Sequence, residues 1–302
     1  MRRLLIITGV SAALLAGFGL LLQPSPRADD EAHVPDPTPA SAAATAAPES
    51  FDPLRSRLTV GWLPETLTAR GSSTTPVLEE LYASHATSDV LVSIVPPGAP
   101  PPAYFTDATV QPGPPIGAKS SRWYTDRAVH FLRWEWAPGA VAQVEISGLS
   151  DPLGTATRIA RSVRVGDGTP VALPLTTSRP RDLVTLRTDV VRDRFGDLTA
   201  GVTFSSPTDP DAQIEVSAIP ERADPPTTTL GGRPAREILI GDERTVTFAL
   251  DPKTQLRIRC RAADDRSSTV GALRAECLRI AASAHPAGML SDPRSWTAHP
   301  IR

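Results

Sequence analysis

The stretch DRAVHFLRWEWAPGAVAQVEI, residues 126–146, decides the fold that we expect for this chain. Its segments 128–136 and 140–146 alternate apolar and polar side chains or are rich in β-branched and aromatic residues, as strands are. Ala137-Pro138-Gly139 between them is typical of a turn. A similar run at Val90–Val95 precedes the pair. The sequence therefore predicts neighbouring antiparallel strands in this region.

A helix is predicted directly after these strands. Asp151 is a typical N-cap, and Pro152 suits the first helical position. One face of the helix then carries an apolar stripe: Leu153, Ala156, Ile159, Ala160 and Val163.

The chain then repeats this pattern. Four short segments recur in the same order: Asp89–Pro96 as Gln213–Pro220, Ile116–Arg122 as Leu230–Arg236, Arg127–Phe131 as Arg244–Phe248, and Arg158–Ser162 as Arg279–Ser283. We interpret this as a tandem duplication of one unit of roughly 110 residues.

Strands closed by one amphipathic helix predict an α+β fold. We expect two tandem similar units, each an antiparallel sheet with one packed C-terminal helix, after an N-terminal transmembrane helix and a disordered tether. An all-β sandwich is the alternative, and the helical pattern that ends both units disfavours it. The predicted segments are a cytoplasmic stub at 1–3, a signal anchor at 4–22, a Pro/Ala-rich linker at 23–52, the units at 53–167 and 168–286, and a tail at 287–302.

The N-terminus predicts a membrane anchor. Residues 4–22 contain no charged side chain, and nineteen helical residues span about 28 Å, close to the hydrocarbon thickness of a bilayer. Arg2 and Arg3 precede this segment, so the positive-inside rule keeps the N-terminus in the cytoplasm and the rest outside. Segment 23–28 offers no good small-x-small cleavage site, which favours an uncleaved anchor over secretion after signal cleavage.

Composition excludes one class of partner. The formal net charge of −2 argues against general binding to nucleic acid or to anionic lipid surfaces, which requires a concentrated basic surface. Lys119 and Lys253 are the only lysines, so nearly all positive charge is arginine.

Cys260 and Cys277 are the only cysteines. The period of two in Leu256–Cys260 puts Cys260 on the apolar side of a strand, while Cys277 lies on the apolar stripe of the following helix. Both sulfurs then face the same layer, and an extracytoplasmic location favours oxidation. We expect a structural disulfide. Two buried free thiols are the alternative.

No motif indicates chemistry. The sequence contains no G-x-S-x-G, glycine-rich phosphate loop, C-x-x-C or H-E-x-x-H, and its five histidines lack metal-ligand spacing. We therefore expect no catalytic residue, cofactor or metal. An enzyme acting on envelope polysaccharide is the alternative, with Glu135, Asp126 and Asp151 as its candidate carboxylates.

Trp134 and Trp136 are the candidate ligand-binding residues. His130, Leu132 and both tryptophans fall on one face of their strand, which is either core or an exposed aromatic strip that binds a ligand. The duplication replaces His130 by Thr247 and leaves the tryptophans without aromatic counterparts. Any function special to the first unit is thus predicted at these two rings.

An apolar N-terminal helix, a proline-alanine tether and arginine-rich domains together resemble uncharacterised membrane-anchored or exported proteins of actinobacteria. The part beyond the tether resembles the extracytoplasmic sensor halves of envelope regulatory proteins. This implies a noncatalytic ectodomain that binds an envelope protein or a cell-wall component, with the bilayer as partner of residues 4–22. A regulatory or assembly accessory of an envelope membrane complex is the further alternative. The sequence indicates no ligand and no oligomeric state.

Overall fold

The structure is a computed structural model that describes residues 47–102, 108–241, 243–262 and 268–302. All of these residues belong to one compact unit. The predicted stub, the predicted anchor at 4–22 and residues 23–46 of the predicted linker lie outside the described residues. In the ranges given, no helix is both long and apolar enough to cross a membrane.

The first half of this unit contains nine strands and one helix. In chain order these are β1 (Arg55–Val60), β2 (Ala69–Thr74), β3 (Glu79–His85), β4 (Ser88–Val95), β5 (Thr109–Ile116), β6 (Lys119–Asp126), β7 (Val129–Ala137), β8 (Ala140–Ser147), α1 (Pro152–Ser162) and β9 (Val163–Pro170).

The second half repeats this succession. Its elements are β10 (Leu175–Thr176), β11 (Val184–Arg192), β12 (Leu198–Ser205), β13 (Gln213–Ile219), β14 (Thr228–Leu230), β15 (Arg233–Ile240), β16 (Glu243–Ala249), β17 (Gln255–Arg261), α2 (Ser268–Ser283) and β18 (His285–Pro286), followed by a 3-10 helix at Pro293–Ser295.

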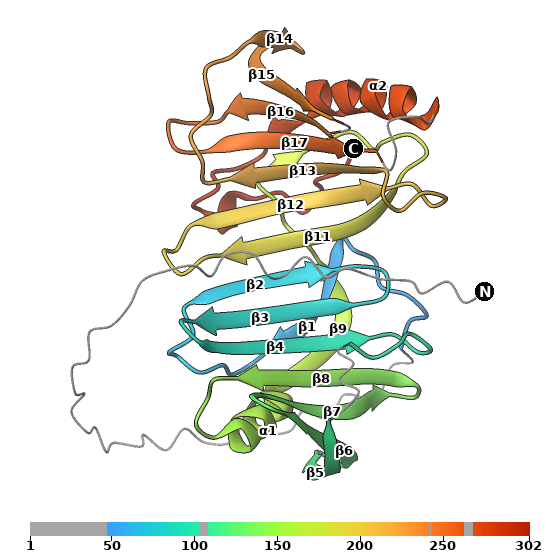
Figure 1. The fold of residues 1–302 in the computed structure, drawn as a ribbon, viewed down its shortest axis with the longest axis vertical. Helices are drawn as coiled ribbons and strands as arrows, with labels where there is room; N and C mark the ends of the chain where they lie inside the picture. Colours follow the sequence, from blue (N-terminus) through green and yellow to red (C-terminus); the bar gives the residue numbers. More distant parts are fainter. Residues whose placement is uncertain (1–46, 103–107, 242, 263–267) are drawn as a thin grey trace, which may run out of the picture. The chain divides into compact units, whose positions relative to one another are not determined.

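One large antiparallel sheet joins the two halves, with fourteen strands in the described part of the chain. From the centre outward the first half runs β2-β3-β4-β8-β7-β6-β5, and the second runs in the same order as β11-β12-β13-β17-β16-β15-β14. The halves meet where β2 pairs with β11, with Ser73 opposite Asp189, and we call this place the join. Figure 1 shows the two strands side by side. β1 pairs with β9, and β10 with β18, in two further small sheets.

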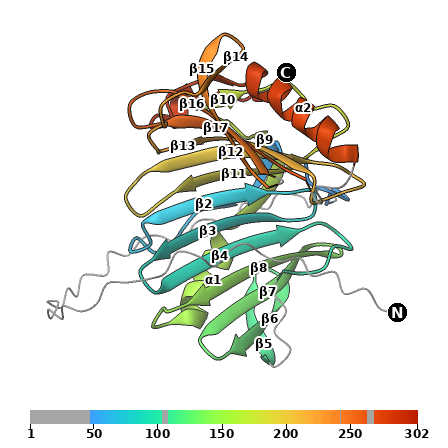
Figure 2. The same ribbon diagram turned by 45° about the horizontal axis from the view of Figure 1, so that its top comes forward.

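The predicted α+β fold class is therefore wrong. The described chain is mostly strand, and the halves share one sheet instead of forming two balanced sheet-and-helix units. The prediction missed strands that lack the expected apolar alternation, such as β2, which reads ARGSST, and β5, which contains three prolines. The sandwich alternative fails as well, because the main strands lie in one sheet (Figure 2).

The predicted start of the first helix is confirmed. The Asp151 carboxylate accepts a hydrogen bond from the Gly154 N–H at 3.0 Å, and Pro152 is the first helical residue. Of the predicted stripe, Ala156, Ile159 and Ala160 are buried, whereas Leu153 is 38% exposed and Val163 is the first residue of β9.

Both helices pack on the same face of the large sheet. α1 contacts β7 and β8, and α2 contacts β16 and β17. Directly paired residues of an antiparallel sheet point to one face. The buried row that starts beneath α2 therefore crosses the join and continues beneath α1: Ile258, Val216, Val202, Thr188, Thr74, Glu79, Ile94 and Ala142.

Each half has its own hydrophobic cluster on this face. The first cluster includes Phe51, which is 2% exposed although it falls within the predicted linker. Near the join, the buried Glu79 carboxylate accepts hydrogen bonds from the Ser56 hydroxyl and from the N–H groups of Arg57 and Leu58, at 2.7 to 2.9 Å. These bonds attach β1 to β3, beneath the sheet.

Candidate functional site

We call the opposite side of the large sheet the open face, because neither helix covers it. Its charged and phenolic side chains come from both halves: Arg187, Asp189, Glu215, Glu243, Arg257, Arg259 and Arg261 in the second half, and Glu80, Tyr82 and Glu145 in the first. Their placement follows from strand alternation, because in β17 the buried Leu256, Ile258 and Cys260 alternate with the three arginines.

Ion pairs organise the open face of the second half. Arg257 approaches Glu215 at 3.3 Å, and Arg259 approaches Glu243 at 2.8 Å. The hydrogen bond from Arg259 lowers the pKa of the Glu243 carboxyl. Arg261, 3.9 Å from the same carboxylate, keeps 54% of its side chain exposed. Positive charge thus stays accessible along β17.

The open face of the first half carries Glu80 and Glu145, and Arg133 lies on the same face. Desolvation by burial raises the pKa of Glu80, and the charge of Glu145 raises it further. Burial likewise raises the pKa of Glu145, with a contribution from Asp89. Neither glutamate has a cation within ion-pair distance among the described residues. Among the described residues, the charge of Arg187 partly offsets the effect of burial on the pKa of Glu80.

The charged residues of the two halves meet at the join. Asp189 forms an ion pair with Arg187 at 2.7 Å, yet burial still raises the pKa of its carboxyl. Burial also raises the pKa of Tyr82 to about 12, with Asp189 as the second cause. The Tyr82 ring lies across Gly71, where an added Cβ would meet the ring at 2.3 Å. Glycine at this position is what lets the ring lie flat on the sheet.

The predicted aromatic site lies on the helix-covered face. Trp134 is 6% exposed and belongs to the first hydrophobic cluster. Trp136 is half-buried, packs against the same cluster and donates its Nε1–H to the Val95 carbonyl at 3.2 Å. Of the two alternatives left by the sequence, this placement favours the core.

The strand pairing also corrects the alignment of the two units at this point. Trp134 pairs with Ala142 of β8, and Phe248 pairs with Leu256 of β17. Ala142 pairs in turn with Ile94 of β4, and Leu256 with Ala218 of β13. Ile94 and Ala218 are matched positions of the sequence repeat. Phe248 is therefore the aromatic counterpart of Trp134, and the sequence match was displaced by three residues.

The predicted disulfide is confirmed. Cys260 and Cys277 are bonded, their Cα atoms are 6.1 Å apart, and both residues are buried. The bond ties β17 to α2. In the first half the positions equivalent to this pair hold Ile146 and Ala156, and both are fully buried.

The other residues singled out by the sequence do not converge. His130 stacks on Trp123 at 5.5 Å between ring centroids. The Glu135 carboxylate accepts a hydrogen bond from the Gly139 N–H in its own turn, and Asp151 caps α1. Asp126 ends β6. The structure therefore gives local roles to the carboxylates of the enzyme alternative.

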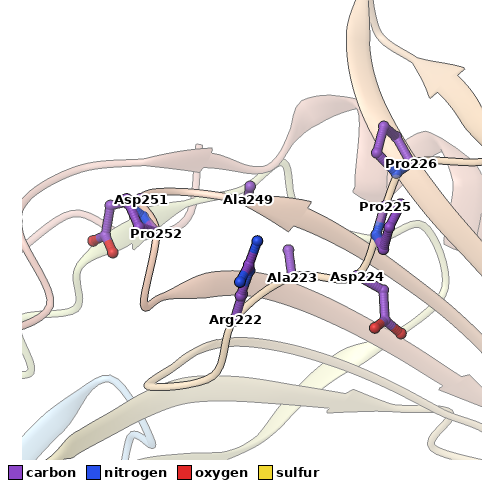
Figure 3. Close-up of a pocket in the computed structure, with 8 residues that line it drawn as sticks. All are labelled: Arg222, Ala223, Asp224, Pro225, Pro226, Ala249, Asp251 and Pro252. Atoms are coloured by element: carbon purple, nitrogen blue, oxygen red, sulfur yellow. The ribbon is translucent and has the colours of Figure 1, made fainter.

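A surface hollow of about 560 Å³ lies where the loop between β13 and β14 meets the turn between β16 and β17. Figure 3 shows Arg222 reaching across it toward Ala249, with Pro225 and Pro226 at one end. The carboxylates of Asp224 and Asp251 point away from the hollow, in opposite directions.

Sequence reasoning missed both the open face and this hollow. The alternation QLRIRCR at Gln255–Arg261 was used only to orient Cys260, although it also predicts a row of arginines on the opposite face. Nothing in the sequence around Arg222 indicates a hollow, because its walls come from segments about 25 residues apart.

No family model and no curated protein matches this chain. Among solved structures, the crystal structure of MucB in complex with MucA(peri) is 12% identical and has a TM-score of 0.25, with 73% of this chain and 93% of that chain covered. The complex structure of Pseudomonas aeruginosa MucA/MucB gives 12% identity and 0.25, with 73% and 92% covered. A TM-score this low establishes neither a shared fold nor a shared function.

Proposed function

We propose that this chain is a noncatalytic protein of the cell envelope that binds a protein partner through the open face of its large sheet. The observation that carries the proposal is the charge on that face, where the half-buried Glu80 and Glu145 form no ion pair with a described residue and β17 presents a row of arginines. Complementary charge on a partner relieves this imbalance and steers association.

Neighbouring acids and arginines divide the open face into two regions. Glu80 and Glu145 lie in the first half, and Arg257, Arg259 and Arg261 lie in the second. A partner suited to both presents basic side chains to the first region and acidic side chains to the second. This pattern fixes the orientation of the partner as well as its affinity.

A noncatalytic role is supported by what the sequence-predicted acids do. Glu135 and Asp151 are engaged in a turn and a helix cap, and Trp134 fills the core instead of lining a substrate groove.

An extracytoplasmic location is supported by the disulfide, because such bonds persist in oxidising compartments. We propose that residues 4–22 anchor the chain in the cell membrane with the N-terminus in the cytoplasm. Secretion after signal cleavage is the alternative. The resemblance to exported actinobacterial proteins fits either case.

Site-specific photo-crosslinking in cells tests the proposal. A benzophenone amino acid at Thr245, on the open face, is expected to give a discrete protein adduct. The same probe at Leu153, an exposed residue of α1 on the other side, is the matched control. Arg259→Glu places an acid beside Glu215 and is expected to reduce the Thr245 adduct at least tenfold.

Equal adducts from Thr245 and Leu153, or an adduct unchanged by Arg259→Glu, would contradict the proposal. An adduct found only with probes within residues 4–22 would instead identify an accessory that meets its partner through its membrane segment.

A further inference from the structure

The hollow around Arg222 has one uncommitted charge. Arg222 is exposed and forms no ion pair or hydrogen bond with any described residue. Figure 3 shows its guanidinium inside the hollow, between Ala223 and Ala249. A guanidinium presents a planar fork of donors that matches a carboxylate.

The two acids at the ends of the hollow are already engaged. Asp224 forms an ion pair with Arg236 at 3.2 Å. The Asp251 carboxylate accepts hydrogen bonds within its own turn, from the N–H of Lys253 at 2.7 Å, the N–H of Thr254 at 2.9 Å and the Thr254 hydroxyl. These bonds lower the pKa of Asp251 and keep its charge directed at the turn. Arg222 therefore lacks a partner although two acids are near it.

The walls of the hollow are apolar and stiff. Pro225, Pro226 and Pro252 line it together with the methyl group of Ala249. Proline rings lose little freedom when a ligand binds, since their backbone φ angle is already fixed. An exposed arginine alone binds a carboxylate weakly, so the apolar walls must supply the remaining affinity.

The corresponding turn of the first half is built differently. There Pro97 lies 3.6 Å from the place that a Cβ of Gly139 would occupy, within ordinary van der Waals contact. Strand pairing makes Glu135 the counterpart of Ala249, since Glu135 pairs with Val141 and Ala249 with Gln255. Glu135 thus places a carboxylate where the second half has the methyl group of Ala249.

We propose that this hollow binds a carboxylate carried on a small apolar body, with Arg222 as the charged contact and the prolines as the walls. Two sources share this chemistry: a free organic acid and the C-terminus of a peptide. The site is separate from the charged residues of the open face, because it lies at the strand ends and uses none of them.

Ligand-observed saturation-transfer NMR on the full chain tests this site. The probes are 3-phenylpropionate and N-acetyl-Ala-Leu, each compared with its neutral amide. Both carboxylates are expected to bind with dissociation constants near 1 mM, and the amides at least tenfold more weakly. Binding of 3-phenylpropionate alone assigns the free acid as source, and binding of the peptide as well assigns the C-terminus.

Variants at Arg222 and Ala249 separate the contribution of charge to binding from that of the shape of the hollow. Arg222→Gln is expected to weaken carboxylate binding at least tenfold and to leave the amides unchanged, whereas Arg222→Lys keeps part of the affinity. Ala249→Leu fills the hollow and is expected to abolish binding of all probes. Arg194→Gln removes another exposed arginine, which lies in the β11–β12 turn over the Phe195 ring, and is the control, with thermal melting to check each fold.

Absence of saturation transfer to both carboxylates would overturn the proposal. So would carboxylate binding that survives Arg222→Gln, or amides that bind as well as the acids. None of these outcomes bears on the crosslinking test of the open face.

Discussion

The two halves contain the same succession of strands but tie their helices to the sheet by different chemistry. In the second half Cys260 and Cys277 form a disulfide. In the first half the equivalent residues are Ile146 and Ala156, which are buried in the hydrophobic cluster. The comparison teaches that this position needs a firm contact between the strand and the helix, and that apolar packing and a covalent bond both supply it.

A second difference lies near the join. The buried Glu79 of the first half corresponds to Ala200 in the second, since Glu79 pairs with Ile94 and Ala200 with Ala218. Glu79 holds β1, which has six residues, whereas its counterpart β10 has only two. The acid is therefore tied to the longer strand.

The largest expected effect comes from removing this acid. Glu79→Ala leaves the N–H groups of Arg57 and Leu58 without their buried acceptor, and we expect a loss of about 3–5 kcal/mol in the free energy of unfolding. Urea denaturation followed by circular dichroism measures it. Glu80→Ala, the next residue but on the open face, is the control. A loss below about 1 kcal/mol would contradict the role of Glu79 in holding β1.

The disulfide gives the next largest effect. Cys260→Ser combined with Cys277→Ser is expected to cost about 3 kcal/mol, as the loop-entropy model gives for a separation of 17 residues. Cys260→Ile with Cys277→Ala installs the pair of the first half and is expected to cost less. Equal losses for both double variants would show that the apolar pair of the first half cannot replace the disulfide in the second half.

The equivalence of Trp134 and Phe248 predicts a smaller change in the free energy of unfolding. Trp134→Phe copies the second half at its equivalent position and is expected to cost about 1–2 kcal/mol, because the core around it stays apolar. Open-face crosslinking should remain unchanged, since the ring is buried on the other side. A Trp134→Phe variant that folds normally but loses its partner adduct would restore the ligand-binding interpretation.

The smallest effect concerns the open-face acids. The pKa of Glu80 is raised above its ordinary value of 4.5, so the folded state favours the protonated form. Stability from this group is complete below pH 4.5 and is lost as pH rises through the raised pKa. Glu80→Gln is therefore expected to stabilise the protein slightly at pH 7 and to flatten its stability between pH 4 and 7, as thermal melts across that range would show. A steeper dependence of stability on pH in Glu80→Gln than in the unchanged protein would contradict this expectation.

Local patterns were sufficient for the parts of the fold built from sequence neighbours. The alternation in 128–136 and 140–146 predicted β7 and β8, and Asp151-Pro152 predicted the start of α1. Apolar periodicity on a strand and on the following helix predicted the disulfide. In each case the decisive contacts join residues that are close along the chain.

The fold class failed because strands with few apolar residues escaped the pattern. β2 contains two serines, a glycine and a threonine, yet five of its residues pair with β11 more than a hundred positions away. Long-range pairing stabilises such a strand through backbone hydrogen bonds, which leave no side-chain signal. The same reason hid the register that aligns Trp134 with Phe248.

The sequence by itself determined the repeated order of segments, the β7–β8 hairpin, the start of the first helix and the cysteine pair, because periodicity and turn chemistry are local. Only the tertiary structure decided that the halves share one sheet, that the tryptophan face is covered, and that Arg222 faces a proline-lined hollow. Those features depend on pairing between distant strands and on which face the helices cover, and neither is encoded in the spacing of neighbouring residues.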